Sequence, residues 1–498
     1  MNLNRETLKN FVSNNDVLPN HLIKSGIIHF GVGGFHRAHE AVYTEDAMLK
    51  SKDYNWGIVG IEVMPSSDLM NHAMKKQDCL YTLMTRPSFG EPKIRIISSI
   101  QSYIYKYDEN NTTDDIYKAF LSDDIKIISL TITEGGYNIN RITGEFNLEN
   151  DLVKQDIQNF DSPRTIFGYL AKAMKIRKTQ VGSGLTILSC DNILHNGDVT
   201  KKMFLTFLEH SDMELMRWVE ENCSFPNSMV DRITPKTTEE DKEIVRSLSD
   251  FDDLWPVASE PFSQWIIEDK FIEGRPRWEL AGAQFVDDVF PYEKMKLRLL
   301  NASHQALSYI GYLNGYRYVH EAALDPIINE FVRFYMKNEV VKTLDPVPGI
   351  NIEEYQNSIL ERFSNPNIKD TLSRNCEYTS DRIPVFNIPS MLEQISDSKN
   401  LHASAIILAS WAIYALGKDE QGNDINIVDH RKEEVLCAAK KSIDKPKYFL
   451  MIEDLFGCLG KDEYFVKNFT KYYYDLKERG SLKTVSDFLE KSRKEKKH

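Results

Sequence analysis

Short apolar runs alternate with segments of helical periodicity through the first half of the chain. The β-prone run 26–30 meets a glycine-rich turn, and residues 35–50 then place apolar side chains at helical spacing. The remaining predicted elements of this half are strands at 56–61, 80–84, 94–97, 125–132 and 185–190, and a helix at 165–177. Buried strands alternating with helices predict an α/β fold, with a parallel sheet covered on both faces.

The pattern changes near residue 290, where strand-like runs become scarce. Helices are predicted at 293–312, 326–337, 352–363, 403–416 and 433–442. The almost uncharged stretch 401–417 is too short to span a bilayer comfortably, so we interpret it as a buried helix. We therefore expect a sheet-containing domain at 1–285 and a mostly α-helical domain at 286–498.

Composition limits the classes of partner. Of 498 residues, 61 are Lys or Arg and 74 are Asp or Glu, a net charge of −13 that disfavours nucleic acid and membrane surfaces. The six cysteines form no CxxC pair, which argues against a thiolate metal site or a disulfide framework. Residues 1–14 contain no apolar segment of a secretion signal, so we expect a cytoplasmic protein.

The glycine-rich turn indicates a nucleotide site. Gly31 and Gly33 supply the first two glycines of GxGxxG, Gly34 and Phe35 follow, and His36 occupies the third glycine position. Such a turn lets backbone N–H groups approach a pyrophosphate closely. Taken alone, the pattern also fits a purely structural strand–helix corner, but the flanking strands favour the nucleotide.

Acidic residues beyond the second strand indicate which dinucleotide is preferred. Between Trp56 and Asp68 the chain has two acids, Glu62 and Asp68, and no Lys or Arg. Carboxylates accept hydrogen bonds from ribose hydroxyls and repel a 2′-phosphate, so we expect NAD. Lys75 and Lys76 lie only slightly farther along.

Lys296, Asn301 and His304 form the most informative pattern. On a regular helix Asn301 lies about 140° and His304 about 80° from Lys296, within one broad face. A lysine, an amide and an imidazole arranged in this way can take up a proton and hydrogen-bond a substrate oxygen. The spacing alone is more typical of an ordinary amphipathic helix with a capping amide.

Several motifs in order resemble the mannitol dehydrogenase family of polyol-specific long-chain dehydrogenases. The Lys296-x4-Asn301-x2-His304 pattern is similar to the catalytic signature of that family. The other matching blocks are Gly31–Arg37, Thr131–Tyr137, Ser189–Asn192, Met229–Arg232, Glu260–Trp265 and Arg362–Pro366. Together they cover about residues 27–390 and are highly specific.

The resemblance implies a Rossmann-type N-terminal domain, a helical C-terminal domain, an active site in the cleft between them, and hydride transfer without a metal. By this resemblance Lys296 is the general base, and Asn192 and Asn301 donate to the substrate oxygen. His304 holds the substrate, and Glu293 connects the lysine to solvent.

Five positions concern substrate and cofactor. The resemblance makes Arg374 and Arg382 substrate contacts, although the second is usually Lys in the mannitol branch. It also puts Asp68 and Asp231 near the cofactor. Glu134 follows a strand end, where ligands bind in open α/β sheets, so we expect it near the nicotinamide.

A lysine base is chemically reasonable here. An alcohol donates hydride well only as it approaches an alkoxide, and lysine can take that proton if its pKa falls from about 10.4. Desolvation or neighbouring cations such as Arg298 would lower it. The sequence has no HExxH motif and no Cys/His cluster with zinc spacing, which is consistent with a metal-free reaction.

The expected substrate is a small polyol or ketose. Blocks 78–83 and 361–370 resemble the mannitol branch of the family, and this resemblance implies oxidation of D-mannitol to D-fructose and the reverse. The alternatives are a fructuronate or tagaturonate reductase, since Arg382 suits a carboxylate, and a dehydrogenase of arabinitol or sorbitol. A nucleotide sensor without catalysis would need the Lys-Asn-His set disrupted, and it is intact. The family favours a monomer.

Overall fold

The computed structural model describes residues 1–8, 17–65, 68–109, 113–140, 143–249 and 251–495. It contains two compact units, residues 1–290 and 291–498. They divide at the first turn of α12 (Phe290–Lys296), a few residues beyond the expected 285/286 boundary.

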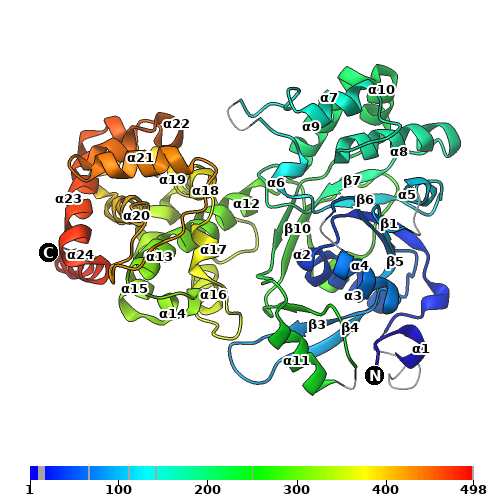
Figure 1. Cartoon of the computed structure of the whole chain (residues 1–498), viewed down its shortest axis with the longest axis horizontal. Coiled ribbons are helices and arrows are strands. Elements are labelled where there is room, and N and C mark those ends of the chain that lie inside the picture. The colour runs from blue at the N-terminus through cyan, green and yellow to red at the C-terminus, as the bar shows by residue number, and fades with distance from the viewer. Residues whose placement is uncertain (9–16, 66–67, 110–112, 141–142, 250, 496–498) are drawn as a thin grey trace. The chain divides into compact units, whose positions relative to one another are not determined.

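A five-stranded parallel sheet forms the centre of the N-terminal unit, as the sequence predicted (Figure 1). Its order is β5-β2-β1-β6-β7. The strands are β1 (Ser25–Phe30), β2 (Gly57–Glu62), β5 (Ile100–Tyr105), β6 (Ile127–Leu130) and β7 (Thr186–Ser189). β1 pairs with β2 on one side and with β6 on the other. β2 and β5 therefore extend the sheet in one direction from β1, and β6 and β7 extend it in the opposite direction. Open α/β sheets bind ligands beside such a reversal, at the carboxyl ends of the strands.

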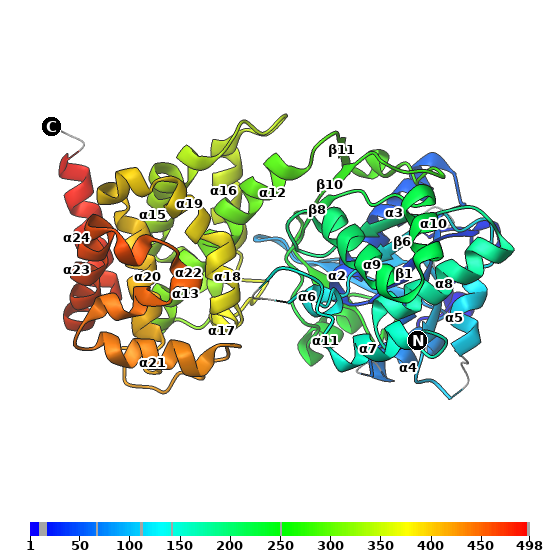
Figure 2. The ribbon, with the colours of Figure 1, turned by 90° about the horizontal axis from the view of Figure 1, so that it is seen from above.

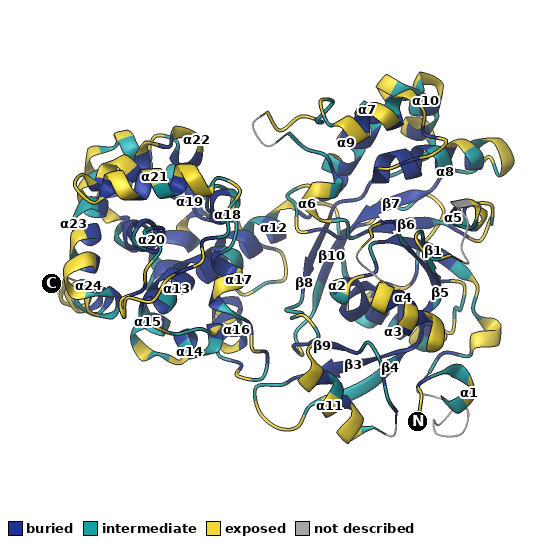
Figure 3. Ribbon diagram, in the orientation of Figure 1, coloured by how far each residue is buried: buried dark blue, intermediate teal, exposed yellow. Residues whose placement is uncertain are grey.

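Both faces of this sheet are covered, because successive side chains of each strand point to opposite sides. Ile28 and Leu130 pack against helices on one face, whereas Ile27 and Ile127 pack against α2 and α3 on the other. Figures 1 and 2 show these layers, and Figure 3 shows β6 and β7 as buried. The helices of this unit are α1 (Arg5–Leu8), α2 (Gly34–Ala38), α3 (Glu40–Ser51), α4 (Asp68–Lys76), α5 (Thr113–Ala119), α6 (Thr133–Gly136), α7 (Asp151–Gln158), α8 (Ile166–Gln180), α9 (Asn196–Ser211), α10 (Met213–Asn222) and α11 (Glu239–Leu248).

Two small sheets complete the unit and correct part of the expectation. The predicted strands 80–84 and 94–97 do form, but they pair antiparallel in a separate sheet of order β4-β3-β9. The other small sheet has the order β11-β10-β8. The strands are β3 (Tyr81–Thr85), β4 (Lys93–Ile97), β8 (Ser228–Asp231), β9 (Val257–Ser259), β10 (Gln264–Glu268) and β11 (Gln284–Val286). Sequence periodicity missed β5 and β8 to β11, most of which are too short to show alternation.

The second unit consists mostly of helices joined by loops, as expected. Its helices after α12 are α13 (Ala302–Leu313), α14 (Val319–Leu324), α15 (Pro326–Tyr335), α16 (Ile352–Phe363), α17 (Leu372–Cys376), α18 (Thr379–Phe386), α19 (Ile388–Glu393), α20 (His402–Tyr414), α21 (Lys432–Ser442), α22 (Glu453–Phe456), α23 (Glu463–Arg479) and α24 (Ser481–Glu495). Two π-helical turns, Leu297–Asn301 and Met336–Val340, interrupt the regular geometry.

Helix α20 is the buried helix predicted at 401–417. It packs against α13, α15, α21 and α23 (Figure 2). Its first backbone N–H groups, from Ala403 and Ser404, donate to the buried carboxylate of Glu339 at 2.7 and 2.8 Å. Burial raises the pKa of Glu339 to about 7. None of the helices in the described ranges combines the length and apolar character of a membrane span.

Candidate functional site

The glycine-rich turn at the end of β1 leaves room for a ligand. Gly31 has φ +90°, and a Cβ there would lie 2.1 Å from the carbonyl oxygen of Thr131, so this position requires glycine. Gly33 has an ordinary extended backbone, and the nearest atom to a Cβ added there is 3.9 Å away. The first helical bond, from Arg37 N–H to the Gly33 carbonyl, leaves the preceding N–H groups of α2 without helical partners. Open space beside unpaired N–H groups at a helix start is the arrangement that binds an anion.

The helix predicted at 35–50 is wrong in one respect, because the chain breaks it at His39. This residue has φ −124° and ψ −92°, and it separates α2 from α3. Its buried Nε2 donates to the carbonyl of Gln264 at 2.9 Å, and its ring stacks on Phe35 at 4.9 Å. A buried imidazole needs such a partner, and Gln264 lies far along the chain, so sequence periodicity could not reveal the break.

A buried carboxylate that sequence reasoning did not assign joins two loops at the ends of β6 and β7. Asp191 accepts hydrogen bonds from the backbone N–H groups of Ile132 and Thr133, at 3.0 and 2.9 Å, and from the Tyr137 hydroxyl at 2.7 Å. Burial raises the pKa of Asp191 to about 6. The only sequence signal was its position next to Asn192 in a matching block.

The hydrogen bonds of Asp191 hold two predicted site residues at one edge of the sheet. Asn192 follows it directly, and Glu134 lies in α6 (Figure 1). Both side chains are exposed. Because β1 and β6 are parallel neighbours, Gly31, which follows the last residue of β1, lies at this same edge. The edge therefore carries backbone donors, an amide and a carboxylate.

The acidic positions occupy two places. Glu62 is the last residue of β2, whose neighbour β1 leads into the glycine turn, and the exposed Asp68 begins α4. Residues 66–67 between them lie outside the described part of the chain. Lys75 forms an ion pair with Asp108, which compensates its charge. Asp231 ends β8 in a small sheet, where its charge acts on His39.

In the helical unit, Lys296, Asn301 and His304 lie on one segment, but its geometry differs from the regular helix expected. The turn Leu297–Asn301 is π-helical, and the N–H of Ala302 donates to the carbonyl of Leu297, five residues back. In such a turn, residues five apart align as residues four apart do in an α-helix. Lys296 and Asn301 therefore lie closer to the same face of the helix than they would in a regular α-helix. His304 follows three residues after Asn301. Such turns are frequent at functional sites.

The polar groups of this helix are largely buried. Glu293 is 4%, Lys296 6% and His304 8% exposed. The ring of His304 packs on Phe363 with centroids 4.0 Å apart. The side-chain oxygen of Asn301 is buried and has no hydrogen-bond partner among the described residues. A buried side-chain oxygen with unused acceptor capacity is expected where a ligand donates a hydrogen bond to it.

The two predicted arginines already have partners within the protein. The guanidinium of Arg374 makes a two-bond pair with the carboxylate of Asp370, both bonds at 2.8 Å. Arg382 donates to the carbonyls of Arg374 and Asn375 at 2.9 and 3.1 Å. Arg382 thus fixes the backbone that carries Arg374, a role the sequence did not reveal.

The parallel sheet, the glycine turn at its reversal and the polar groups beside it define a Rossmann-type nucleotide-binding unit. Residues 25–280 match the family model described as the mannitol dehydrogenase Rossmann domain, and residues 288–477 match the mannitol dehydrogenase C-terminal domain. The chain therefore belongs to the mannitol dehydrogenase family.

Known relatives match nearly the whole chain. A mannitol 2-dehydrogenase of Neosartorya fischeri is 40% identical over 474 residues, covering 94% of each chain. The solved structure of Pseudomonas fluorescens mannitol 2-dehydrogenase, a ternary complex with NAD and D-mannitol, is 37% identical with a TM-score of 0.88 and covers 99% of this chain and 100% of that one. A substrate-free D-sorbitol dehydrogenase is 35% identical with a TM-score of 0.88, covering 97% of this chain and 100% of that one.

Proposed function

We propose that this protein catalyses the NAD-dependent oxidation of D-mannitol to D-fructose and the reverse reaction. The observation that carries the proposal is the set of buried Lys296, half-buried Asn301 and buried His304 around the π-helical turn Leu297–Asn301. The mannitol 2-dehydrogenases among its relatives support this choice of polyol.

In the proposed mechanism, Lys296 takes the hydroxyl proton as the alcohol is oxidised. The side chains of Asn192 and Asn301 each donate an N–H to the oxygen as negative charge develops there. His304 holds the substrate, and Glu293, three residues before the lysine on α12, passes the proton toward solvent. The chemistry that bound NAD supplies is acceptance of the hydride.

For the cofactor, the proposal assigns the pyrophosphate to the turn at Gly31, Gly33, Gly34 and Phe35. Asp68 accepts hydrogen bonds from the adenosine ribose, which favours NAD over NADP.

Glu134 and Asp231 are the other two residues that the proposal puts near the cofactor. Glu134 lies at the carboxyl edge of β6, where the nicotinamide would approach Asn192.

A uronate substrate is the weaker alternative. The Asp370 carboxylate already holds the fork of Arg374, and Arg382 donates to two backbone carbonyls. A substrate carboxylate would have to compete with Asp370 for the fork of Arg374, whereas the two bonds of Arg382 use only its Nη1. Sorbitol stays the second candidate, because a D-sorbitol dehydrogenase resembles this chain almost as closely as the mannitol enzyme does.

The test is a panel of polyols, ketoses and keto-uronates assayed with NAD(H) and NADP(H). We expect the highest kcat/KM with mannitol and fructose, lower values with sorbitol and arabinitol, and weak reduction of fructuronate. A kcat/KM for fructuronate above that for fructose would move the protein to the uronate branch.

Three further properties belong to the proposal. We expect no loss of activity after prolonged EDTA treatment. A loss of activity that added zinc restores would contradict a metal-free reaction. We expect a monomer, tested by light scattering on the eluting protein. The six free thiols suit a reducing cytoplasm, which fractionation of cells would test.

A further inference from the structure

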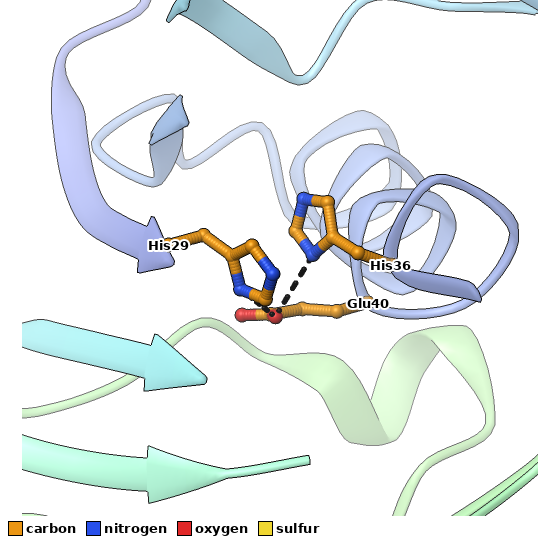
Figure 4. Close-up of side chains that lie close together, drawn as sticks. All are labelled: His29, His36 and Glu40. Atoms are coloured by element: carbon orange, nitrogen blue, oxygen red, sulfur yellow. Dashed lines mark hydrogen bonds and ion pairs between the residues drawn. The ribbon is translucent and has the colours of Figure 1, made fainter. Parts of the chain in front are cut away.

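Three polar side chains are buried beneath the glycine turn, and the mechanism above does not use them. They are His29 in β1, His36 in α2 and Glu40 at the start of α3, each no more than 1% exposed (Figure 4). Oε2 of Glu40 lies 3.0 Å from Nδ1 of His29 and 3.2 Å from Nδ1 of His36. Burying polar groups this completely costs free energy unless hydrogen bonds compensate it, so the cluster indicates a structural or functional role.

The composition of the cluster suits a metal ion, but its geometry does not. The two imidazole rings are stacked, with centroids 3.5 Å apart and planes inclined by 19°. An imidazole nitrogen binds a metal with a lone pair that lies in the ring plane. One ion cannot lie in two nearly parallel planes separated by this spacing, so the arrangement favours proton sharing.

The hydrogen bonds continue from Glu40 through His29 to the glycine turn. Nε2 of His29 lies 2.9 Å from the hydroxyl of Thr131, and that hydroxyl donates to the carbonyl of Gly31 at 2.7 Å. The same carbonyl accepts from the N–H of Gly33 at 2.7 Å. A hydroxyl has one proton, so if Thr131 donates to Gly31 it must accept from His29.

The ring of His29 has partners on both nitrogens. Its Nδ1 lies 3.0 Å from the Glu40 carboxylate and 2.7 Å from the hydroxyl of Ser129, and its Nε2 lies 2.9 Å from the hydroxyl of Thr131. Burial by itself raises the pKa of Glu40, but the charge and hydrogen bonds of His29 and His36 outweigh it and hold that pKa well below its usual range. The contacts from two imidazoles therefore compensate the burial of this carboxylate.

We propose that the His29–Glu40 pair, acting through the Thr131 hydroxyl, positions the carbonyl of Gly31 and so sets the shape of the turn that receives the dinucleotide pyrophosphate. These are positioning residues that control cofactor affinity and not the chemical step. The inference rests on the proposed use of NAD.

The test compares full-length variants by titration with NADH, by kcat at saturating cofactor, and by thermal unfolding. Thr131→Val removes the hydroxyl at nearly constant shape, and Thr131→Ser restores it. Thr484→Val is the matched control, since its buried hydroxyl donates to the Gly480 carbonyl at 2.8 Å in the other unit. Glu40→Gln probes the far end of the chain of bonds, where direct contact with a cofactor is excluded by burial.

We expect Thr131→Val and Glu40→Gln to raise the Kd for NADH at least about fivefold while kcat stays within about threefold, which is affinity lost without loss of the chemical step. Thr131→Ser should bind within about twofold of the wild type, and Thr484→Val should lose stability only. An unchanged Kd in Thr131→Val, or a loss confined to kcat, overturns the inference. If Glu40→Gln does not fold, the Thr131 variants decide. Wild-type protein that binds no NADH would instead overturn the proposed function.

Discussion

Replacing Gly33 by alanine separates the stability of the glycine turn from its capacity to bind cofactor. Gly33 has φ −95° and ψ −172°, an extended conformation that alanine adopts without strain. The nearest atom to the added methyl group would be the Gly31 carbonyl oxygen, 3.9 Å away. The protein itself therefore has room for this group, whereas a bound pyrophosphate would compete for the same space.

The two effects have opposite signs. Alanine reduces the conformational freedom of the unfolded chain, which stabilises the protein by about 0.4–1 kcal/mol where the native backbone is compatible. Displacing the pyrophosphate would lose at least one hydrogen bond to a charged group, worth about 1.5–3 kcal/mol. That loss corresponds to a Kd for NADH raised roughly tenfold to a hundredfold.

The assay is titration of NADH fluorescence, with thermal unfolding measured on the same protein. Gly31→Ala provides the contrast, because its methyl group would lie 2.1 Å from the Thr131 carbonyl oxygen at a backbone φ of +90°. We expect Gly31→Ala to lose stability and Gly33→Ala to keep it. An unchanged Kd for NADH in a stable Gly33→Ala variant would refute the close approach of the cofactor to this turn. A marked loss of stability in Gly33→Ala would refute the conclusion that the protein has room for a methyl group at Gly33.

Four further variants test other parts of the argument. Lys296→Ala should fold and bind NADH normally but lose at least about 100-fold in turnover, and near-normal turnover at neutral pH would remove this lysine from the mechanism. Asp68→Ala should improve the relative use of NADP by removing charge repulsion, unless the wild type already prefers NADP, which would contradict the assignment. Arg382→Lys should stay within about tenfold of wild type on mannitol, and a collapse of strong fructuronate reduction would indicate the uronate branch. The raised pKa of Glu339, about 7, means that its contribution to stability is complete below about pH 4.5 and is lost as the pH rises through 7. Glu339→Gln should therefore gain roughly 2–3 kcal/mol in unfolding free energy relative to wild type between pH 5 and pH 8, and denaturation curves with a pH-independent difference would contradict this.

Local signals accounted for much of the fold. The strand before Gly31 and the buried helix α20 were predictable because each shows its apolar pattern within a short window. The change to helical periodicity near residue 290 was visible for the same reason, and the two units divide there. Short strands such as β9 and β11 carry too few residues to show alternation, and they exist because a partner strand pairs with them.

The candidate site likewise has features that the sequence shows locally and features that only the structure shows. The order of the glycines and the spacing of Lys296, Asn301 and His304 are properties of the sequence, so a hypothesis about their chemistry could be drawn from it. The π-helical turn that realigns Lys296 with Asn301 could not, because one altered hydrogen bond in a continuous helix leaves apolar periodicity almost unchanged.

Interactions between distant segments were decided only by the tertiary structure. Asp191 accepts hydrogen bonds from a loop almost sixty residues earlier, and His29 reaches Thr131 across about a hundred residues. Arg382 gained two carbonyl partners from the neighbouring helix α17. The sequence determined which reactive groups the protein carries and their local spacing. Their partners, charges and orientation depend on which buried polar groups the folded chain brings together, because a buried group must find its hydrogen bonds wherever packing places them.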